Sequence, residues 1–537
     1  MKRKLLTALL SSALMLTALT GCDQRAEDQS VTNGASTDGE NIARDELVFV
    51  NYRDIRDLNP HLYAGEMYAQ SILYDTLVSN TSEGYAGCLA EDWTISEDGR
   101  TYTFNIRDGV TFSDGTPCDA NAILANFNAI LENRERHTWL EMMNLLVGVS
   151  APDDDTFVIE MSEPYYPMLT ELACIRPFAM ISPNCMIDGS TKDGVNGYIG
   201  TGPYVLTDFV TDEYAIFERN ENYWGEKPTI QKITVKVIPD NQTRIMALEN
   251  GEIDLIFGKN MLDADAISQY VDSDKFTVGL SDPTSTRHIV LNTTHAILEN
   301  KAVRQALQHA TNRQAISEGI FYGLEPAADT LYSTTVPYCG VGLGSYAYDM
   351  DEAARLLDEA GWTMGSDGIR TKDGQKLALN LLYNSDSVTE KAISEYLQSE
   401  YLKLGISLNI HGEEEQSYRD NMKAGNFDMV FNICWGMPYD PQSSLAAMRA
   451  PVYGDYAAQQ GLEDKAEIDQ AITDILTSTD EAERQELYTF VLTRLHEDAV
   501  YIPLTFETNK ALYTSDLKGV HFGTDQYDVD FASMYFE

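Results

Sequence analysis

The sequence predicts an α/β protein built from more than one packed unit. Its 537 residues are too many for one core, because folded domains hold roughly 150 residues each, so two to four units are expected. Two stretches alternate strand-like and helix-like patterns in the order strand, helix, strand. They lie in residues 233–258 and 376–410, and such alternation is typical of parallel sheets covered by helices.

The first unit is expected to begin with a short buried strand near Glu46 and a helix within residues 59–78. Residues 100–112 alternate polar and apolar side chains, which predicts a strand. Residues 120–137 form a helical pattern that Asp119 can cap, and its apolar face is formed by Ile123, Phe127, Ile130 and Leu131. Residues 165–178 predict a short apolar helix that Pro177 ends, with Arg176 at its last turn.

A second unit is expected to begin near Pro283. Residues 300–320 predict one long helical stretch, and the alternation at 376–410 follows it. Two segments of the tail, 499–508 and 511–523, have strand-like patterns. We expect these segments to return to the first unit.

The N-terminus has the features of an export signal. Positive residues at 2–4 precede an apolar stretch, Leu5–Leu19, which is shorter than the about 20 residues that span a bilayer. Its end, LTGC at Leu19–Cys22, resembles a bacterial lipobox, in which Cys22 carries the lipid. Residues 23–44 are polar and predict a flexible tether of roughly 25 Å mean reach. No later apolar stretch is long enough to cross a membrane.

Charge and cysteine content exclude several classes of protein. The formal net charge is -46, which argues against nucleic-acid binding, because phosphates require basic stripes. Six cysteines follow Cys22 without CxxC spacing. A chain of this size does not need disulfides to fold, so they are interpreted as small buried apolar residues, with one or two bridges left open.

Basic and aromatic residues gather at NRERHTWLE, Asn133–Glu141, in this acidic chain. One interpretation is structural, since cations at a helix C-terminus are stabilised by the macrodipole by roughly 0.3–1 kcal/mol. The other is that Arg136 awaits an anionic ligand. Arg134 is assigned to the structural role.

The sequence carries no motif for catalysis. GxSxG, HExxH and P-loop patterns are absent, and the Gly200–Gly202 segment lacks the third glycine of a dinucleotide fingerprint. No two histidines are three or four residues apart, so a local metal cage made of protein side chains alone is not expected. The chain is therefore not expected to be an enzyme or to hold a resident cofactor. Several aromatic residues in turn-like segments could line a cleft: Tyr63, Tyr165, Tyr166, Trp435, Tyr439 and Tyr453.

Several strings resemble the peptide/nickel family of extracellular solute-binding proteins of ABC importers (family 5), from about residue 46 onward. They are LAEDWTISEDGRTYTFNIRDGVTFSDGTPCDA, IGTGPYVL, RNENYWGEKP, NKAVRQALQHATNR and AARLLDEAGW. Further strings are similar to the nickel-binding branch: NRERHTWLE, NPHLY, EPYYPMLTELACIRPF, WGMPYDPQSSLAAMRAP and LTRLHEDAVYIPL.

The resemblance implies an α/β, two-lobed periplasmic-binding-protein (Venus flytrap) fold with an extra subdomain inserted in lobe I. The expected segments are a signal peptide 1–21, a tether 22–45 from lipidated Cys22, lobe I 46–282 with the insertion 86–200, lobe II 283–506, and a return to lobe I 507–537.

In that branch the ligand is a metal held by a small carboxylate-bearing chelator. The resemblance assigns Arg136 and Arg176 to the chelator's carboxylates, which suits the planar donors of guanidinium. It assigns the walls of the pocket to Tyr63, Met67, Trp139, Trp435 and Tyr439, although Tyr63 and Met67 are one residue closer than in the family pattern.

One position departs from the nickel-binding pattern. Tyr453 stands where relatives can place a metal-binding histidine, and a phenol is a poor ligand for nickel. Either the chelator fills the coordination sphere, or the ligand is another chelate, another metal or an anionic peptide.

The expected function is a lipid-anchored, extracytoplasmic receptor that captures a Ni(II)-chelator complex, or another transition-metal chelate, and delivers it to an ABC permease. The protein is expected to act as a monomer on the periplasmic side of the cell membrane. The alternatives are a dipeptide or oligopeptide receptor and, more distantly, a secreted hydrolase.

Overall fold

The computed structural model describes residues 44–81, 84–258, 261–434, 441–523, 527 and 529–537. Residues 44–537 form one compact unit. The predicted signal peptide, Cys22 and the predicted tether up to residue 43 lie outside the described residues, as do Trp435 and Tyr439. None of the helices in the described segments has the length and apolar character that crossing a bilayer requires.

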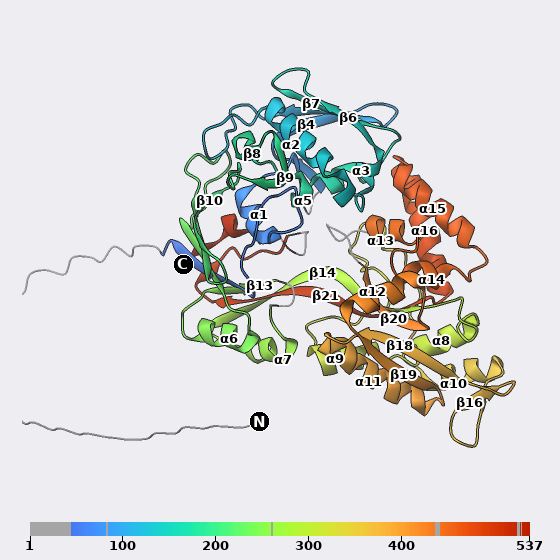
Figure 1. Ribbon diagram of the computed structural model, residues 1–537. Helices are drawn as coiled ribbons and strands as arrows, with labels where there is room; N and C mark the ends of the chain where they lie inside the picture. Colours follow the sequence, from blue (N-terminus) through green and yellow to red (C-terminus); the bar gives the residue numbers. More distant parts are fainter. Residues whose placement is uncertain (1–43, 82–83, 259–260, 435–440, 524–526, 528) are drawn as a thin grey trace, which may run out of the picture. The chain divides into compact units, whose positions relative to one another are not determined.

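A ten-stranded sheet runs through the unit (Figure 1) in the order β10-β11-β12-β1-β13-β21-β14-β20-β18-β19. The long strands β14 and β21 pair antiparallel in its middle, so the chain passes between the two halves of the sheet along them. The bounds are β1 (Glu46–Asn51), β10 (Tyr204–Val210), β11 (Tyr214–Arg219), β12 (Lys232–Val237), β13 (Leu255–Phe257), β14 (Phe276–Leu291), β18 (Ala378–Asn384), β19 (Ser407–Glu413), β20 (Met429–Cys434) and β21 (Tyr501–Thr514).

The first half of the sheet confirms the predicted strand–helix–strand unit. β1 pairs in parallel with β12 and β13, and α6 (Asn241–Glu249) connects β12 to β13. Leu47 and Phe49 point from β1 into a core with Phe217 and Leu255, all at most 1% exposed. Alternation of side chains along a strand places these apolar residues on the buried face.

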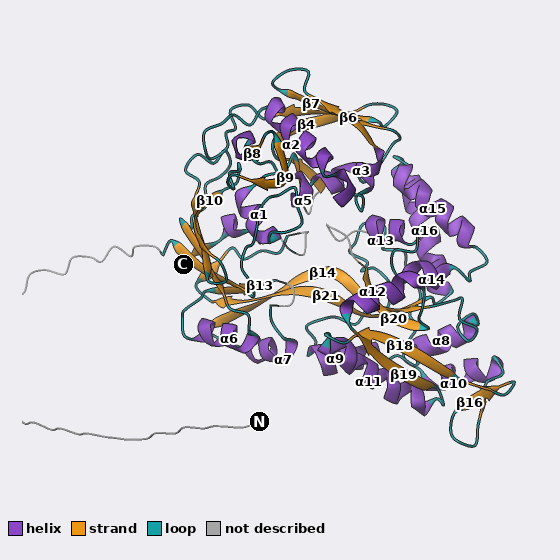
Figure 2. Cartoon of the chain, in the orientation of Figure 1, coloured by secondary structure: helices purple, strands orange, loops and turns teal. Residues whose placement is uncertain are grey.

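The second half repeats this arrangement with its own core. β18 pairs in parallel with β19 and β20, and α11 (Val388–Lys403) connects β18 to β19. Leu379, Leu381, Ile393 and Leu397 are fully buried in a separate cluster. Figure 2 shows purple helices beside the orange strands in both halves. The fold is therefore α/β with two lobes, as predicted.

A four-stranded antiparallel sheet, β4-β5-β7-β6, lies outside the main sheet. Its strands are β4 (Ala90–Ile95), β5 (Thr101–Ile106), β6 (Leu146–Ser150) and β7 (Thr156–Met161). The helix α2 (Ala120–Glu132) packs on this sheet, and the carboxylate of Asp119 caps it by accepting from the amide of Ala122 at 2.9 Å. Ile123, Phe127 and Ile130 are buried as predicted, while Leu131 is only partly buried.

Two helix predictions were wrong in detail. The single helical stretch predicted for residues 300–320 is two helices, α8 (Lys301–His309) and α9 (Arg313–Phe321), because Asn312 caps a new helix by accepting from the amide of Ala315. The helix expected to reach Pro177 ends earlier: α4 covers Met168–Leu172. Arg176 itself has extended backbone angles, as residues before proline prefer.

The tail segments predicted as two strands form one long strand, β21, followed by β22 (Leu517–Lys518). The remaining helices are α1 (Met67–Leu73), α3 (Glu141–Leu145), α5 (Ile175–Phe178), α7 (Ala264–Ile267), α10 (Met350–Glu359), α12 (Glu415–Ala424), α13 (Pro441–Ala447), α14 (Asp455–Gln459), α15 (Lys465–Thr477) and α16 (Glu481–Glu497). The remaining strands are β2 (Val78–Thr81), β3 (Gly84–Gly87), β8 (Met186–Ile187), β9 (Ser190–Val195), β15 (Thr363–Met364), β16 (Arg370–Lys372), β17 (Gln375–Lys376) and β23 (Tyr535–Phe536).

Tyr166, beyond β7, contacts the helices α15 and α16 of the second half. Its amide donates to the carbonyl of Leu476 at 3.0 Å, and its hydroxyl donates to the carboxylate of Glu481 at 2.6 Å. The guanidinium carbon of Arg484 lies 3.4 Å from the centre of the Tyr166 ring, an arrangement that favours a cation–π interaction. Tyr166, predicted as a possible cleft residue, therefore joins two regions far apart in sequence.

Candidate functional site: an arginine beside an aromatic cluster

Tyr63, His137 and Trp139 form a hydrogen-bonded cluster. The indole N–H of Trp139 donates to the hydroxyl of Tyr63, and this hydroxyl lies 2.8 Å from Nδ1 of His137. Because indole can only donate, the Tyr63 hydroxyl accepts a hydrogen bond from Trp139 and donates one to Nδ1 of His137. Neutral His137 therefore carries its proton on Nε2. Two of the predicted wall residues, Tyr63 and Trp139, are thus in direct contact.

Ionisation does not disturb this chain of hydrogen bonds at neutral pH. Burial lowers the pKa of His137 to about 4, since a desolvated imidazole resists protonation. Burial also raises the pKa of Tyr63 to about 12. The imidazole acceptor and the phenol donor therefore keep the protonation states that the cluster requires.

Arg176 lies next to this cluster, with its guanidinium carbon 5.7 Å from the centre of the Tyr63 ring. The residue is only 9% exposed. Its Nε and Nη2 donate to the side-chain oxygen of Gln70 at 3.3 and 3.0 Å, and Nη2 also donates to the carbonyl of Gly65. Burial lowers the pKa of Arg176, although guanidinium keeps its charge in proteins.

No carboxylate of the described residues forms an ion pair with Arg176, and none of them is hydrogen-bonded to its Nη1. A buried charge without a directly bonded counter-charge is costly. The hydrogen bonds of Nε and Nη2 fix the orientation of the guanidinium. The N–H groups of Nη1 are left to donate to a ligand.

Gln70 and Gly65 hold Arg176 in place. Gln70 is fully buried on α1, and its amide donates to the carbonyl of Asn59 at 3.2 Å, which leaves its oxygen directed at Arg176. Residue 65 must be glycine, because a Cβ there would lie 2.5 Å from the carbonyl oxygen of Asp57. This close approach sets the direction of the Gly65 carbonyl.

Glu171 ties the loop that carries Trp139 to the segment that carries Arg176. Its carboxyl group accepts from the amides of Glu141 and Met142, at 3.2 and 3.0 Å, at the first turn of α3. These contacts satisfy amides that the helix itself leaves unpaired. The aromatic cluster and Arg176 are therefore positioned by the same small region.

The two arginines of the NRERHTWLE segment differ in their contacts. Arg134 donates to the carbonyl of Leu146 and so has a structural contact. Arg136 is exposed at the end of the short 3-10 turn Arg134–Arg136. Its side chain forms no hydrogen bond or ion pair with other described residues, and it precedes His137 of the cluster. Arg136 is therefore available to an anion.

A pocket of about 700 Å³ lies on the side of Arg176 where α1 begins. The predicted wall residue Met67 lines it together with Arg176, and Arg53, Glu66 and Arg244 are the other charged residues of its lining. The volume is within the usual range for small-molecule sites. Its charged lining suits a ligand that carries anionic groups.

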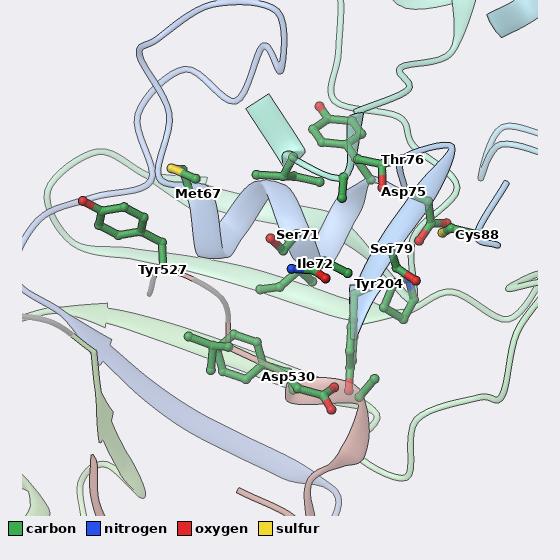
Figure 3. Close-up of a pocket in the computed structure, with 18 of the residues that line it drawn as sticks. Met67, Ser71, Ile72, Asp75, Thr76, Ser79, Cys88, Tyr204, Tyr527 and Asp530 are labelled. Atoms are coloured by element: carbon green, nitrogen blue, oxygen red, sulfur yellow. The ribbon is translucent and has the colours of Figure 1, made fainter. Parts of the chain in front are cut away.

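A smaller pocket of about 290 Å³ lies along α1 and shares Met67 with the first (Figure 3). In Figure 3, Met67 lies at one end of this pocket and Asp75 and Cys88 lie at the other, with Asp530 below. Burial raises the pKa of Asp75. With aspartates and no arginine in its lining, this pocket is the less suitable one for a carboxylate.

Tyr453 does not line the pocket of Arg176. It lies in the lining of a different pocket of about 550 Å³, with Tyr418, Arg419 and Glu415. Because Trp435 and Tyr439 fall outside the described residues, the structure places six of the eight predicted site residues. It brings Tyr63, Trp139 and Arg176 together, with Met67 and the exposed Arg136 beside them.

No group of three or more His, Cys, Asp or Glu side chains suited to a metal ion occurs in the described part of the chain. The structure places none of the six cysteines after Cys22 in a disulfide. Any metal bound at the Arg176 pocket would therefore need ligands other than such a cluster of described side chains.

Sequence reasoning missed Gln70, Arg53 and Glu66. Gln70 follows Met67 by three residues on a helix, where a polar residue usually faces solvent. Arg53 and Glu66 belong to a charged segment that looked like ordinary protein surface. None of these positions carries a local pattern that indicates a ligand.

The structure is a two-lobed α/β protein with a charged pocket at Arg176, and this arginine lies next to the aromatic cluster of Tyr63, His137 and Trp139. Comparison with known proteins gives the family. Residues 84–455 match the model of bacterial extracellular solute-binding proteins, family 5, and the chain belongs to this family.

Among its relatives, the nickel-binding periplasmic protein of Escherichia coli is 41% identical over 497 residues, which cover 92% of this chain and 95% of the relative. The crystal structure of NikA from Brucella suis in complex with Fe(III)-EDTA is 43% identical, with a TM-score of 0.88, and the match covers 92% of this chain and all of that one. The dipeptide-binding protein of E. coli is 26% identical over 90% of this chain and 94% of the relative.

The chain is thus a solute-binding protein of an ABC importer in the nickel/peptide family. Membership implies a permease partner and a small-molecule ligand, and the relatives act outside the cytoplasm. The relatives are transport-associated binding proteins, which points away from catalysis.

Proposed function

We propose that this protein captures a transition-metal ion, nickel, inside a complex with a small carboxylate-bearing chelator. The observation that carries the proposal is Arg176, a buried guanidinium held on one edge by Gln70 and Gly65 without a carboxylate partner among the described residues. A carboxylate of the ligand would supply the missing counter-charge through a charge-assisted hydrogen bond.

The aromatic cluster supports this proposal. Tyr63 and Trp139 are each about two-fifths exposed, so their faces can contact a ligand that Arg176 holds. Arg136 precedes Trp139 on the same segment and would supply a second guanidinium. The metal would then be bound mainly by its chelator, whose carboxylates the arginines would bind.

The proposed ligand is also consistent with the relatives. The Brucella suis relative was crystallised with Fe(III)-EDTA, a metal held by a polycarboxylate, and the E. coli relative is a nickel-binding protein. A ligand that touches both lobes would stabilise the closed state by its higher affinity for that state.

Calorimetry tests the proposal. The purified chain is titrated with nickel alone, with nickel plus L-histidine and with nickel plus a polycarboxylate chelator. We expect binding only for the complexes, because the site recognises the chelator's carboxylates. Strong binding of the bare ion contradicts the proposal.

A dipeptide or oligopeptide receptor is the alternative function, since the dipeptide-binding relative is similar in sequence over most of its length and Tyr453 departs from the nickel-binding pattern. A peptide carries a terminal carboxylate that Arg176 could bind. Titration with a mixture of di- and tripeptides without metal distinguishes the two, because only the alternative predicts binding.

The proposal extends to how the protein is attached to the cell envelope. Cys22 would carry the lipid that anchors the chain beside its permease. Labelling cells with a radioactive fatty acid is expected to mark the wild-type protein and to leave the Cys22→Ala variant unmarked. An equally labelled variant would contradict the anchor.

A further inference from the structure

Glu66 and two arginines form a charged group in the lining of the Arg176 pocket. Glu66 Oε1 lies 2.6 Å from Nε of Arg53 and 3.9 Å from Nε of Arg56. The Glu66 carboxylate is buried, whereas the two arginine side chains are about two-fifths exposed. Glu66 and Arg53 both line the pocket of about 700 Å³ together with Arg176.

The charges of this group act on Arg176. Burial is the main cause that lowers the pKa of Arg176, Tyr63 and then Glu66 raise it, and Arg56 and Arg53 lower it further. A ligand held by Arg176 would therefore also interact with the negative charge of Glu66 and the positive charge of Arg53. Arg244, the remaining arginine of the lining, directs its donors at the carbonyls of Ile238, Pro239 and Met261.

The contacts of the Glu66 carboxylate are its ion pairs with Arg53 and Arg56. Glu66 precedes α1, but its side chain does not cap this helix. Its ion-pair partners are the two arginines, of which Arg53 shares the pocket lining. Replacing it with glutamine would keep the size of the side chain and remove only the charge.

We propose that Glu66 and Arg53 determine the charge of the chelate that this pocket accepts. A chelate with a second free carboxylate competes with Glu66 for Arg53 while its first carboxylate binds Arg176. Because Arg53 is long and partly exposed, it can turn to the ligand, whereas Arg176 is fixed by Gln70 and Gly65. Glu66 repels the incoming negative charge and thereby limits the affinity for highly anionic chelates.

This inference rests on the proposed function, and calorimetry with two probes of different charge tests it. The probes are the nickel–bis(L-histidine) complex, which is neutral overall, and nickel–EDTA, which carries two negative charges. Wild type is compared with Glu66→Gln, with Arg53→Gln and with Glu395→Gln, an exposed position on α11 that gives the same change in net charge as Glu66→Gln.

We expect Glu66→Gln to bind nickel–EDTA about tenfold more tightly than wild type does, which corresponds to about 1.4 kcal/mol. Its affinity for the neutral complex should change by less than about twofold. Arg53→Gln should weaken nickel–EDTA binding by a similar factor, and Glu395→Gln should change neither affinity. The gain in Glu66→Gln should shrink at high salt, because screening weakens charge repulsion.

The outcomes separate the two proposals. A wild-type chain that binds the complexes, together with a Glu66→Gln variant whose preference is unchanged, overturns the charge selection alone. A shift of both affinities by the same factor also overturns it, since that indicates a general effect on the pocket. If no form binds either complex, the proposed function and this inference both fail. Thermal unfolding of each variant checks that it is folded.

Discussion

Removal of the Arg176 guanidinium is the sharpest perturbation of the proposed site. Arg176→Ala deletes a charge that is 9% exposed and whose Nε and Nη2 are already held in place. When one partner of a desolvated charge pair is truncated, binding weakens by about 2–5 kcal/mol. We therefore expect the affinity for the metal chelate to fall about 30-fold to several thousand-fold.

The fold should survive this change. Gln70 and Gly65 lose the donor that their oxygens accept from, and an unsatisfied buried acceptor costs about 1–3 kcal/mol. Loss of a buried cation that has no directly bonded counter-charge offsets part of this cost. The free energy of unfolding should therefore drop by much less than the combined cost of the lost contacts.

The assay combines titration calorimetry with urea unfolding of the same preparations. Arg355→Ala serves as the control, since this arginine is exposed on α10 and pairs with Glu352 and Glu359 on its own helix. The control removes the same charge and should leave affinity unchanged. A folded Arg176→Ala protein that binds the chelate as wild type does would refute the role given to Arg176.

Three further predictions follow from the contacts. Gln70→Ala removes the acceptor that holds one edge of Arg176. Chelate affinity should therefore fall about tenfold, although Gln70 is not assigned a ligand contact. An affinity equal to that of wild type in calorimetry contradicts this positioning role. Tyr166→Phe removes the hydroxyl that donates to Glu481 and should lower the free energy of unfolding by about 1 kcal/mol in urea, whereas an unchanged unfolding midpoint would show that this hydrogen bond adds nothing. The folded-state pKa of His137 is lowered to about 4, so between pH 6.5 and 4 the unfolded chain binds a proton that the folded chain does not. The contribution of His137 to the free energy of unfolding is present above pH 6.5 and is lost as the pH falls, by up to about 1.4 kcal/mol per pH unit. The free energy of unfolding in urea should therefore depend less steeply on pH between these values in His137→Gln.

The main elements of the fold could be predicted because their signals are local. Alternating apolar residues in β5 and the apolar stripe of α2 each identify an element and its buried face within a few residues. The capping role of Asp119 is equally local. The break between α8 and α9 was missed, because Asn312 interrupts a pattern whose apolar spacing otherwise continues.

The candidate site was only partly accessible from sequence. Resemblance to the family led to Tyr63, Trp139 and Arg176, which the structure brings together. The contact between Arg176 and Gln70 joins residues 106 positions apart, and no pattern along the chain reports such a pairing. The Glu66–Arg53 ion pair was missed for another reason, because charged residues in a loop look alike whether they face solvent or a pocket.

Native mass spectrometry of the protein as it is isolated from cells tests the central claim most directly. The claim is that the pocket at Arg176 receives a metal together with an anionic chelator. The account predicts a bound mass equal to one metal ion plus a small carboxylate-bearing molecule, which is lost in Arg176→Ala. A bound mass that fits a metal ion alone, or a mixture of peptides without metal, would contradict it.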